Sequence, residues 1–256
     1  MKAVILAGGY GTRLREETEF KPKPMVEIGE RPIIWHIMKN LSMQGMNDFV
    51  LCLGYKGEVI KDYFLNYEAR THDVTVKLGI NDGAVQNFKE ITENWSVTLA
   101  NTGLETLTGG RLLKIKKYVG SETFLCTYGD GLADINLNEL ISFHKSHGKI
   151  ATVTAVRPTN RFGAMQIDQD NLVTKFTEKP QVDTWVNGGF FVFNSEIFSY
   201  LDLDTALEKN PLEALVQDQQ IKSYKHNGFW QPMDTYREVQ ELNKIWIENS
   251  APWKNW

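Results

Sequence analysis

Near its beginning the chain carries an uninterrupted apolar run that ends in a cluster of glycines. Residues 2–7 read KAVILA, and residues 8–11 read GGYG. A strand with one face in water alternates apolar and polar side chains, whereas a strand buried on both faces is apolar throughout. The run therefore predicts an inner strand of a sheet that is covered on both sides. Residues 48–53 (DFVLCL) and 123–128 (TFLCTY) have the same character.

Stretches with helical spacing alternate with these strands. They cover residues 32–44, 57–66, 136–147 and 235–247. This alternation predicts a parallel sheet with right-handed crossovers. The second half adds closely spaced strand candidates at residues 163–168, 172–178 and 185–193. We therefore expect an α/β fold with a Rossmann-like, mixed, mainly parallel central sheet that is flanked by helices and extended by antiparallel strands.

The size and charge of the chain exclude several classes of protein. Its 256 residues suit a single domain, 1–256, in which residues 235–256 form a C-terminal helix and tail and residues 80–95 form an arm or insertion. A net charge of -4 provides no basic field for nucleic acid or for an anionic membrane. The two cysteines lie in apolar runs and predict buried free thiols. We expect a cytoplasmic protein that binds neither nucleic acid nor membrane.

The glycine cluster is the strongest functional signal. It continues as GGYGTR over residues 8–13. Because glycines carry no Cβ, their backbone N–H groups can turn toward a ligand, and such a loop after a strand is typical of a phosphate site. Arg13 adds a planar fork for phosphate oxygens. The spacing matches neither a P-loop nor a dinucleotide fingerprint. A tight turn with a surface arginine is the alternative.

Two further segments carry charged groups that could act on phosphates. Lys23 lies between two prolines in KPKPM (21–25). The prolines restrict the backbone and can thereby orient the lysine side chain. The alternative interpretation of this segment is a solvated loop. Asp130 lies between two glycines after strand 123–128. Ligands of open α/β sheets bind at the carboxyl ends of strands, so Asp130 is a candidate Mg²⁺ ligand, with an Asp-Gly turn as the alternative.

Together these segments resemble the nucleoside-triphosphate:sugar-1-phosphate nucleotidyltransferases, whose signature is G-G-x-G-T-R-L followed by K-P. The resemblance covers essentially the whole chain, and its cytidylyl branch is indicated by TGGRL (108–112), NGGFFV (187–192) and GFWQPMDT (228–235). It implies Mg²⁺ as the cofactor, held by Asp130 and Asp234. Helix capping is the alternative role for Asp234.

The resemblance also implies the other site residues. The catalytic residues are Arg13, Lys23 and Asp130. The nucleotide-binding residues are Leu6, Ala7, Gly8, Gly9, Gly11, Thr12, Arg13, Lys23, Thr108, Gly109, Arg111 and Gly129. The residues that bind the sugar phosphate are Lys179, Asn187, Gly188 and Gly189.

The reaction implied by the resemblance joins CTP and α-D-glucose 1-phosphate into CDP-glucose and pyrophosphate. The same resemblance implies a homo-oligomer, with a hexamer as the expected assembly. Two alternatives stay open. The first is the same chemistry with another nucleotide or another phosphorylated acceptor. The second is a catalytically silent regulatory subunit that binds sugar nucleotides, against which the retention of Arg13, Lys23, Asp130 and Asp234 argues.

Two other patterns have simpler interpretations. His144 and His147 are three residues apart in a predicted helix, but no third metal ligand is evident, so we expect a solvated helix face. The tail contains Trp246, Trp253 and Trp256. These rings predict packing against the core or against a neighbouring subunit.

Overall fold

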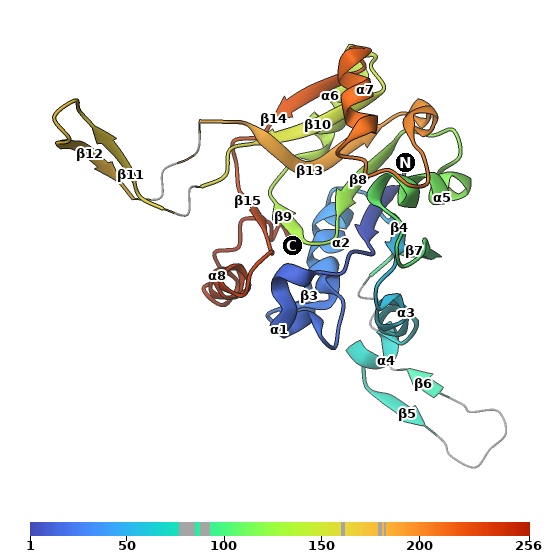
Figure 1. Cartoon of the computed structure of the whole chain (residues 1–256). Helices are drawn as coiled ribbons and strands as arrows, with labels where there is room; N and C mark the ends of the chain where they lie inside the picture. Colours follow the sequence, from blue (N-terminus) through green and yellow to red (C-terminus); the bar gives the residue numbers. More distant parts are fainter. Residues whose placement is uncertain (77–84, 88–92, 160–161, 179–180, 182) are drawn as a thin grey trace.

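A central sheet organises the computed structural model, which describes residues 1–76, 85–87, 93–159, 162–178, 181 and 183–256. Among these residues the sheet has seven strands, in the order β14 (Ile221–Lys225), β10 (Ala151–Val156), β13 (Val186–Phe193), β8 (Phe124–Tyr128), β1 (Ala3–Ala7), β4 (Asp48–Leu53) and β7 (Ser96–Asn101). Only β13 runs antiparallel to its neighbours. The prediction of a mixed, mainly parallel sheet is therefore confirmed (Figure 1).

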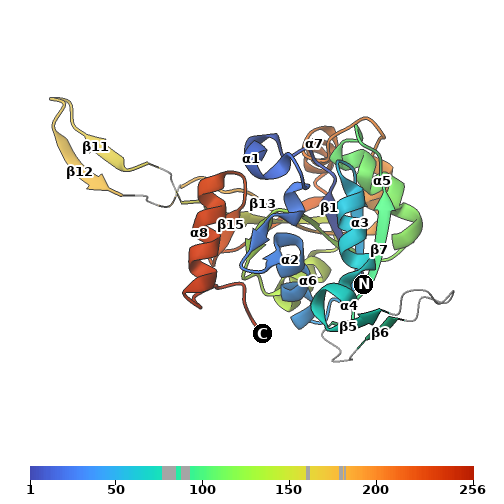
Figure 2. The same ribbon diagram turned by 90° about the horizontal axis from the view of Figure 1, so that it is seen from below.

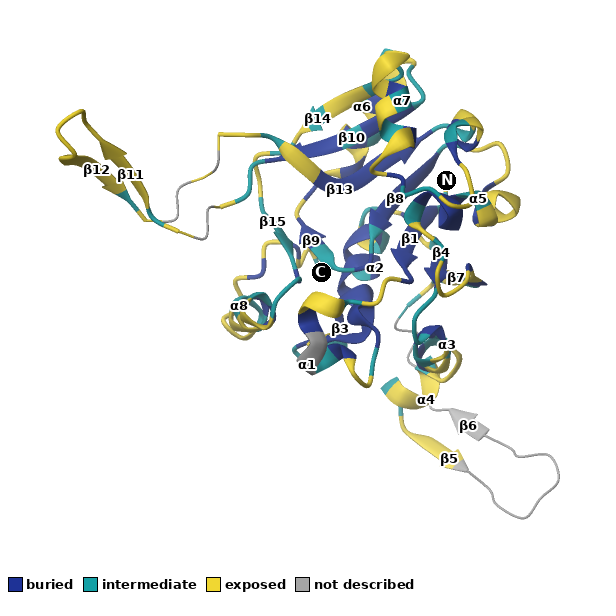
Figure 3. Cartoon of the chain, in the orientation of Figure 1, coloured by how far each residue is buried: buried dark blue, intermediate teal, exposed yellow. Residues whose placement is uncertain are grey.

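Helices cover both faces of the sheet. On one face the core is built with α2 (Ile33–Met43), α3 (Gly57–Leu65), α6 (Leu137–His147) and α8 (Tyr236–Ile247). On the other it is built with α5 (Thr108–Val119), η3 (Ser195–Tyr200) and α7 (Asn210–Gln217). Strand β1 contributes Ala3, Ile5 and Ala7 to the first core and Val4 and Leu6 to the second. Its continuous apolar run is explained by this burial on both faces (Figure 3).

Short elements complete the described chain. They are η1 (Thr12–Leu14), α1 (Arg15–Thr18), η2 (Lys23–Met25), β2 (Glu27–Ile28), β3 (Arg31–Pro32), α4 (Tyr67–Thr71), β5 (Val74–Val76), β6 (Val85–Asn87), β9 (Gly131–Ala133), β11 (Ala164–Ile167), β12 (Val173–Thr177) and β15 (Trp230–Pro232). Most of the predicted arm at residues 80–95 lies outside the described residues. No helix of the described part is long and apolar enough to span a membrane.

Strands β11 and β12 depart from the prediction. They were expected to extend the central sheet, but they pair only with each other as a hairpin that projects from the body (Figures 1 and 2). Met165, Ile167, Val173 and Phe176 are all more than a third exposed. An apolar strand pattern indicates that the strand packs against another surface, but it does not identify that surface. The prediction was wrong because it assigned both strands to the central sheet.

Pairing of β9 with β15 brings distant parts of the chain together. Gly131 is opposite Pro232, and the backbone N–H of Met233 donates to the carbonyl of Asp130 at 2.8 Å. Asp130 and Asp234 therefore lie beside each other at the carboxyl end of β8. This short ladder positions the charged groups of the candidate site.

Candidate active site

The glycine loop follows β1 at the carboxyl end of the strand. Gly11 has a φ of +64°, which other residues rarely adopt. At Gly8 a Cβ would lie 2.2 Å from the guanidinium of Arg111, so this glycine allows Arg111 to approach the loop. Gly9 has no atom within 4 Å of an added Cβ and faces open space. Two of the three glycines are thus required by backbone shape and by packing.

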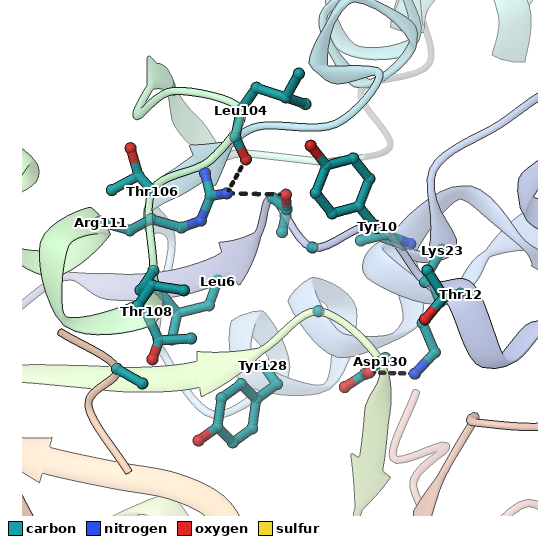
Figure 4. A pocket seen from close by; sticks show the side chains of 18 of the residues that line it. Leu6, Tyr10, Thr12, Lys23, Leu104, Thr106, Thr108, Arg111, Tyr128 and Asp130 are labelled. Atoms are coloured by element: carbon teal, nitrogen blue, oxygen red, sulfur yellow. Dashed lines mark hydrogen bonds and ion pairs between the residues drawn. The ribbon is translucent and has the colours of Figure 1, made fainter. Parts of the chain in front are cut away.

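A hollow of about 430 Å³ opens above this loop. Of the predicted nucleotide-binding residues, all except Gly109 line it (Figure 4). Tyr10 and Tyr128 also line it, together with the segment Leu104–Leu107 and Glu208. The structure therefore gathers residues from five segments that are distant in the sequence into one cavity.

Four charged side chains meet at one end of the hollow. The Nζ of Lys23 lies 2.5 Å from Oδ2 of Asp130 and 2.5 Å from Oδ1 of Asp234. Arg13 donates to the other oxygen of Asp234 at 2.6 Å. The side chain of Lys23 is only 9% exposed, whereas that of Arg13 is 73% exposed. The interpretation of residues 21–25 as a solvated loop is therefore wrong for Lys23, which is buried between two carboxylates.

The capping alternative for Asp234 is settled by the start of α8. Thr235 is the N-cap, and it forms a capping box with Glu238. Asp234 lies one residue earlier, and its carboxylate contacts Lys23 and Arg13 instead. Its side chain is thus directed into the charged cluster.

Arg111 is fully engaged by the protein. Its guanidinium is buried and donates to the carbonyls of Leu53, Gly8, Gly103 and Leu104 and to the hydroxyl of Thr102, at 2.7–3.1 Å. Burial lowers the pKa of Arg111. These bonds tie the glycine loop to the segment after β7, so Arg111 shapes the wall of the hollow.

Gly109 lies beneath the surface rather than in the hollow. Its N–H donates to the carbonyl of Thr205 at 3.1 Å, and an added Cβ would lie 2.7 Å from that oxygen. At Gly110 a Cβ would lie 2.1 Å from the carbonyl of Leu203. The two glycines let residues 203–207 pack on the start of α5.

A second hollow of about 270 Å³ adjoins the first. Asn187, Gly188 and Gly189 line it, and it shares Arg13, Tyr128 and Asp130 with the first hollow. Gly189 has a φ of +78° and packs on the ring of Tyr128. Lys179, the remaining residue predicted for the sugar phosphate, lies outside the described residues.

Several lining residues are not among the site residues predicted from the sequence. Tyr128 donates to Glu208, and burial and the nearby Glu208 carboxylate raise the pKa of Tyr128. Trp230 donates its indole N–H to the carbonyl of Gly188 at 2.7 Å. Tyr10 donates to Glu105. Each of these hydrogen bonds joins segments that are distant in the sequence. Only Tyr128 has a position that indicates a site, because it lies at the carboxyl end of a predicted strand.

The two histidines of α6 do not form the expected solvated face. His144 is 2% exposed, and both its Nδ1 and the Nε2 of His147 bond the hydroxyl of Thr152 at 2.8 Å. They anchor α6 to the sheet. No group of three metal-binding side chains exists within the described ranges. The tail packs on the core, where Trp253 is fully buried.

Comparison with known proteins places this arrangement in a family. The family model described as "Nucleotidyl transferase" matches residues 2–235. The chain belongs to the nucleotidyl transferase family. A member named glucose-1-phosphate cytidylyltransferase, from Salmonella typhi, is 51% identical to the chain over the full length of both. A mannose-1-phosphate guanyltransferase from Saccharomyces cerevisiae is 31% identical over 98% of the chain and 66% of its own length.

The fold is shared with solved structures of other proteins. A UDP-glucose pyrophosphorylase complexed with UDP-glucose superposes with a TM-score of 0.67 at 18% identity, over 97% of this chain and 98% of its own. At that identity the likeness concerns the fold alone.

Proposed function

We propose that the chain transfers a cytidylyl group from CTP to α-D-glucose 1-phosphate and releases pyrophosphate. Family membership supports the reaction type, and the similarity to the Salmonella protein over the full length supports the two substrates. The observation that carries the proposal is the pair of adjoining hollows that share Arg13, Tyr128 and Asp130. Two phosphorylated substrates bound there meet at the charged cluster.

The proposed transfer reaction depends on positioning of the two substrates and on stabilisation of phosphate charge. The phosphate of the sugar is already ionised, so the protein need not create the nucleophile. One of its oxygens attacks the α-phosphorus of CTP in line with the departing pyrophosphate. Arg13, largely exposed at the loop, steadies the pyrophosphate. Lys23 stabilises the charge on the reacting phosphates.

Asp130 and Asp234 fit a Mg²⁺ site. Their carboxylates contact one ammonium, so both lie within reach of a single cation. Mg²⁺ takes oxygen ligands and commonly uses one or two carboxylates beside substrate phosphates. A bound Mg²⁺ would neutralise phosphate charge there. For the sugar phosphate, we propose that Asn187 and the backbone of Gly188–Gly189 form hydrogen bonds with the hexose hydroxyls. Lys179 pairs with the phosphate group.

The assembly is a homo-oligomer, with a hexamer as the expected form. The apolar face of the β11–β12 hairpin supports this, because a lone hairpin is marginally stable in water and its Met165, Ile167 and Phe176 are exposed. Buried free Cys52 and Cys126 support a reducing, cytoplasmic compartment.

Labelled substrates test the proposed reaction. The chain is incubated with glucose 1-phosphate, Mg²⁺ and CTP carrying ³²P at either the α- or the γ-position. The α-label is expected in CDP-glucose and the γ-label in pyrophosphate, in equal amounts. Failure of the α-label to reach a sugar nucleotide would refute the proposal.

A further inference from the structure

The larger hollow has two chemically different ends. Lys23 and Asp130 lie at one end with Thr12, and Arg13 joins them through its contact with Asp234, so this end suits the triphosphate (Figure 4). Leu6, Thr108 and Arg111 lie at the other end, away from Lys23 and Asp130 (Figure 4). The nucleoside of a bound nucleotide therefore points toward the second end.

Glu208 lies on the wall of this nucleoside end. It belongs to the segment between η3 and α7, just before Asn210. One carboxylate oxygen accepts from the hydroxyl of Tyr128, and the other accepts from the hydroxyl of Thr108 at 2.6 Å. Thr108 in turn accepts from the N–H of Leu207 at 2.8 Å. Two hydroxyls from the pocket wall thus fix the carboxylate, while Glu208 itself remains exposed where a ligand can reach it.

The other charged groups near this end are differently engaged. Arg111 donates to backbone carbonyls and a threonine hydroxyl, including the carbonyls of Gly8 and Leu104. Glu105 accepts from the hydroxyl of Tyr10, a residue of the glycine loop. A carboxylate is only an acceptor, and each of its oxygens has lone-pair capacity beyond one hydrogen bond. Glu208 can therefore accept one more donor from a ligand.

We propose that Glu208 reads the base by accepting a hydrogen bond from the exocyclic amine of cytosine. The inference rests on the proposed function and names the residue that sets its nucleotide preference. Glutamate is known to accept a hydrogen bond from the exocyclic amine of cytosine. Uracil carries a carbonyl oxygen at that position, and this oxygen would face the carboxylate without a proton between them. Glu208 therefore selects CTP over UTP.

The test compares the wild type with Glu208→Gln. Gln keeps the shape and one acceptor oxygen, and its amide can instead donate to the uracil carbonyl. The ratio of kcat/KM for CTP to that for UTP is expected to fall roughly tenfold or more, chiefly through a gain with UTP. Glu213→Gln, an exposed change in α7 that lines neither hollow, serves as the matched control and keeps the wild-type ratio.

Binding measurements separate this inference from the proposed function. Equilibrium binding of CTP and UTP by calorimetry gives the same ratio without turnover, so an inactive wild type refutes the proposed function while the base preference is still measured. An unchanged CTP:UTP ratio in a folded Glu208→Gln protein overturns the inference. So does a variant that alters only the preference for CTP over dCTP, since that result assigns Glu208 to the ribose. A ratio that instead changes in Glu105→Gln assigns base reading to Glu105.

Discussion

Replacing Lys23 by methionine removes the ammonium from the charged cluster and keeps a straight side chain of similar length. In the wild type this ammonium lies 2.5 Å from an oxygen of each aspartate. The side chain of Asp130 is 30% exposed and that of Asp234 is 16% exposed. After the change, Arg13 still contacts Asp234, but Asp130 loses its ammonium partner. The variant therefore measures how strongly the carboxylates depend on a cation.

The expected cost follows from this partial burial. Exposed ion pairs contribute roughly 0–1 kcal/mol, whereas loss of one partner of a buried pair costs roughly 3–5 kcal/mol. The intermediate burial gives a loss of about 2 kcal/mol. For a chain of this size that corresponds to a fall in Tm of about 4–8 °C. Turnover falls as well, because a cation is missing from the phosphate site.

Addition of Mg²⁺ makes the experiment specific. A cation that binds only the folded state raises its stability by mass action. Lys23→Met leaves both carboxylates open to Mg²⁺, so the variant should regain most of the lost Tm, while the wild type gains less. Lys21→Met is the matched control, since its ammonium lies 3.6 Å from Glu17 and takes no part in the charged cluster. A Tm equal to the wild type without metal, or equal Mg²⁺ shifts in both proteins, would refute the reasoning.

Three other outcomes are expected. Asp130→Asn should keep the wild-type Tm within a few degrees and lose roughly a thousandfold in Mg²⁺-dependent turnover; full activity would remove Asp130 from the metal site. Burial lowers the pKa of His36 from 6.5 to about 4. As the pH falls, the unfolded chain therefore binds this proton before the folded chain does. In urea denaturation, the contribution of neutral His36 to the free energy of unfolding should be fully present above pH 6.5 and about 3 kcal/mol smaller near pH 4. His36→Gln should lack this contribution to the pH dependence. Light scattering should give a multiple of 29.3 kDa, and a monomer at micromolar concentration would exclude the oligomer.

Local patterns predicted the parts of the fold that depend on burial alone. The apolar run of β1 and the helical spacing of α2 and α6 record their surroundings directly, and their bounds agree with the structure within one or two residues. The glycine loop and Asp130 were found because each follows such a strand. These features need no knowledge of distant residues.

Long-range contacts leave no local pattern in the sequence, and only the family resemblance predicts that Asp130 and Asp234 act together. Asp234 reaches Asp130 only through the pairing of β9 with β15. The guanidinium of Arg111 bonds mainly carbonyls, and a backbone carbonyl leaves no mark in a sequence. Glu208 lies in an irregular segment without periodicity, and its role depends on hydroxyls from β8 and α5. The β11–β12 hairpin was assigned to the wrong sheet for the same reason.

Initial rates with different nucleotides test the central claim most directly. Pyrophosphate release is measured with CTP, UTP, GTP, ATP and dTTP at a fixed concentration of glucose 1-phosphate and Mg²⁺. We expect CTP to have the highest kcat/KM, UTP to be a weaker second, and the purine nucleotides to be poor. A higher value for dTTP or ATP would contradict the cytidylyl assignment, and the absence of pyrophosphate release with every nucleotide would contradict the assignment as an enzyme.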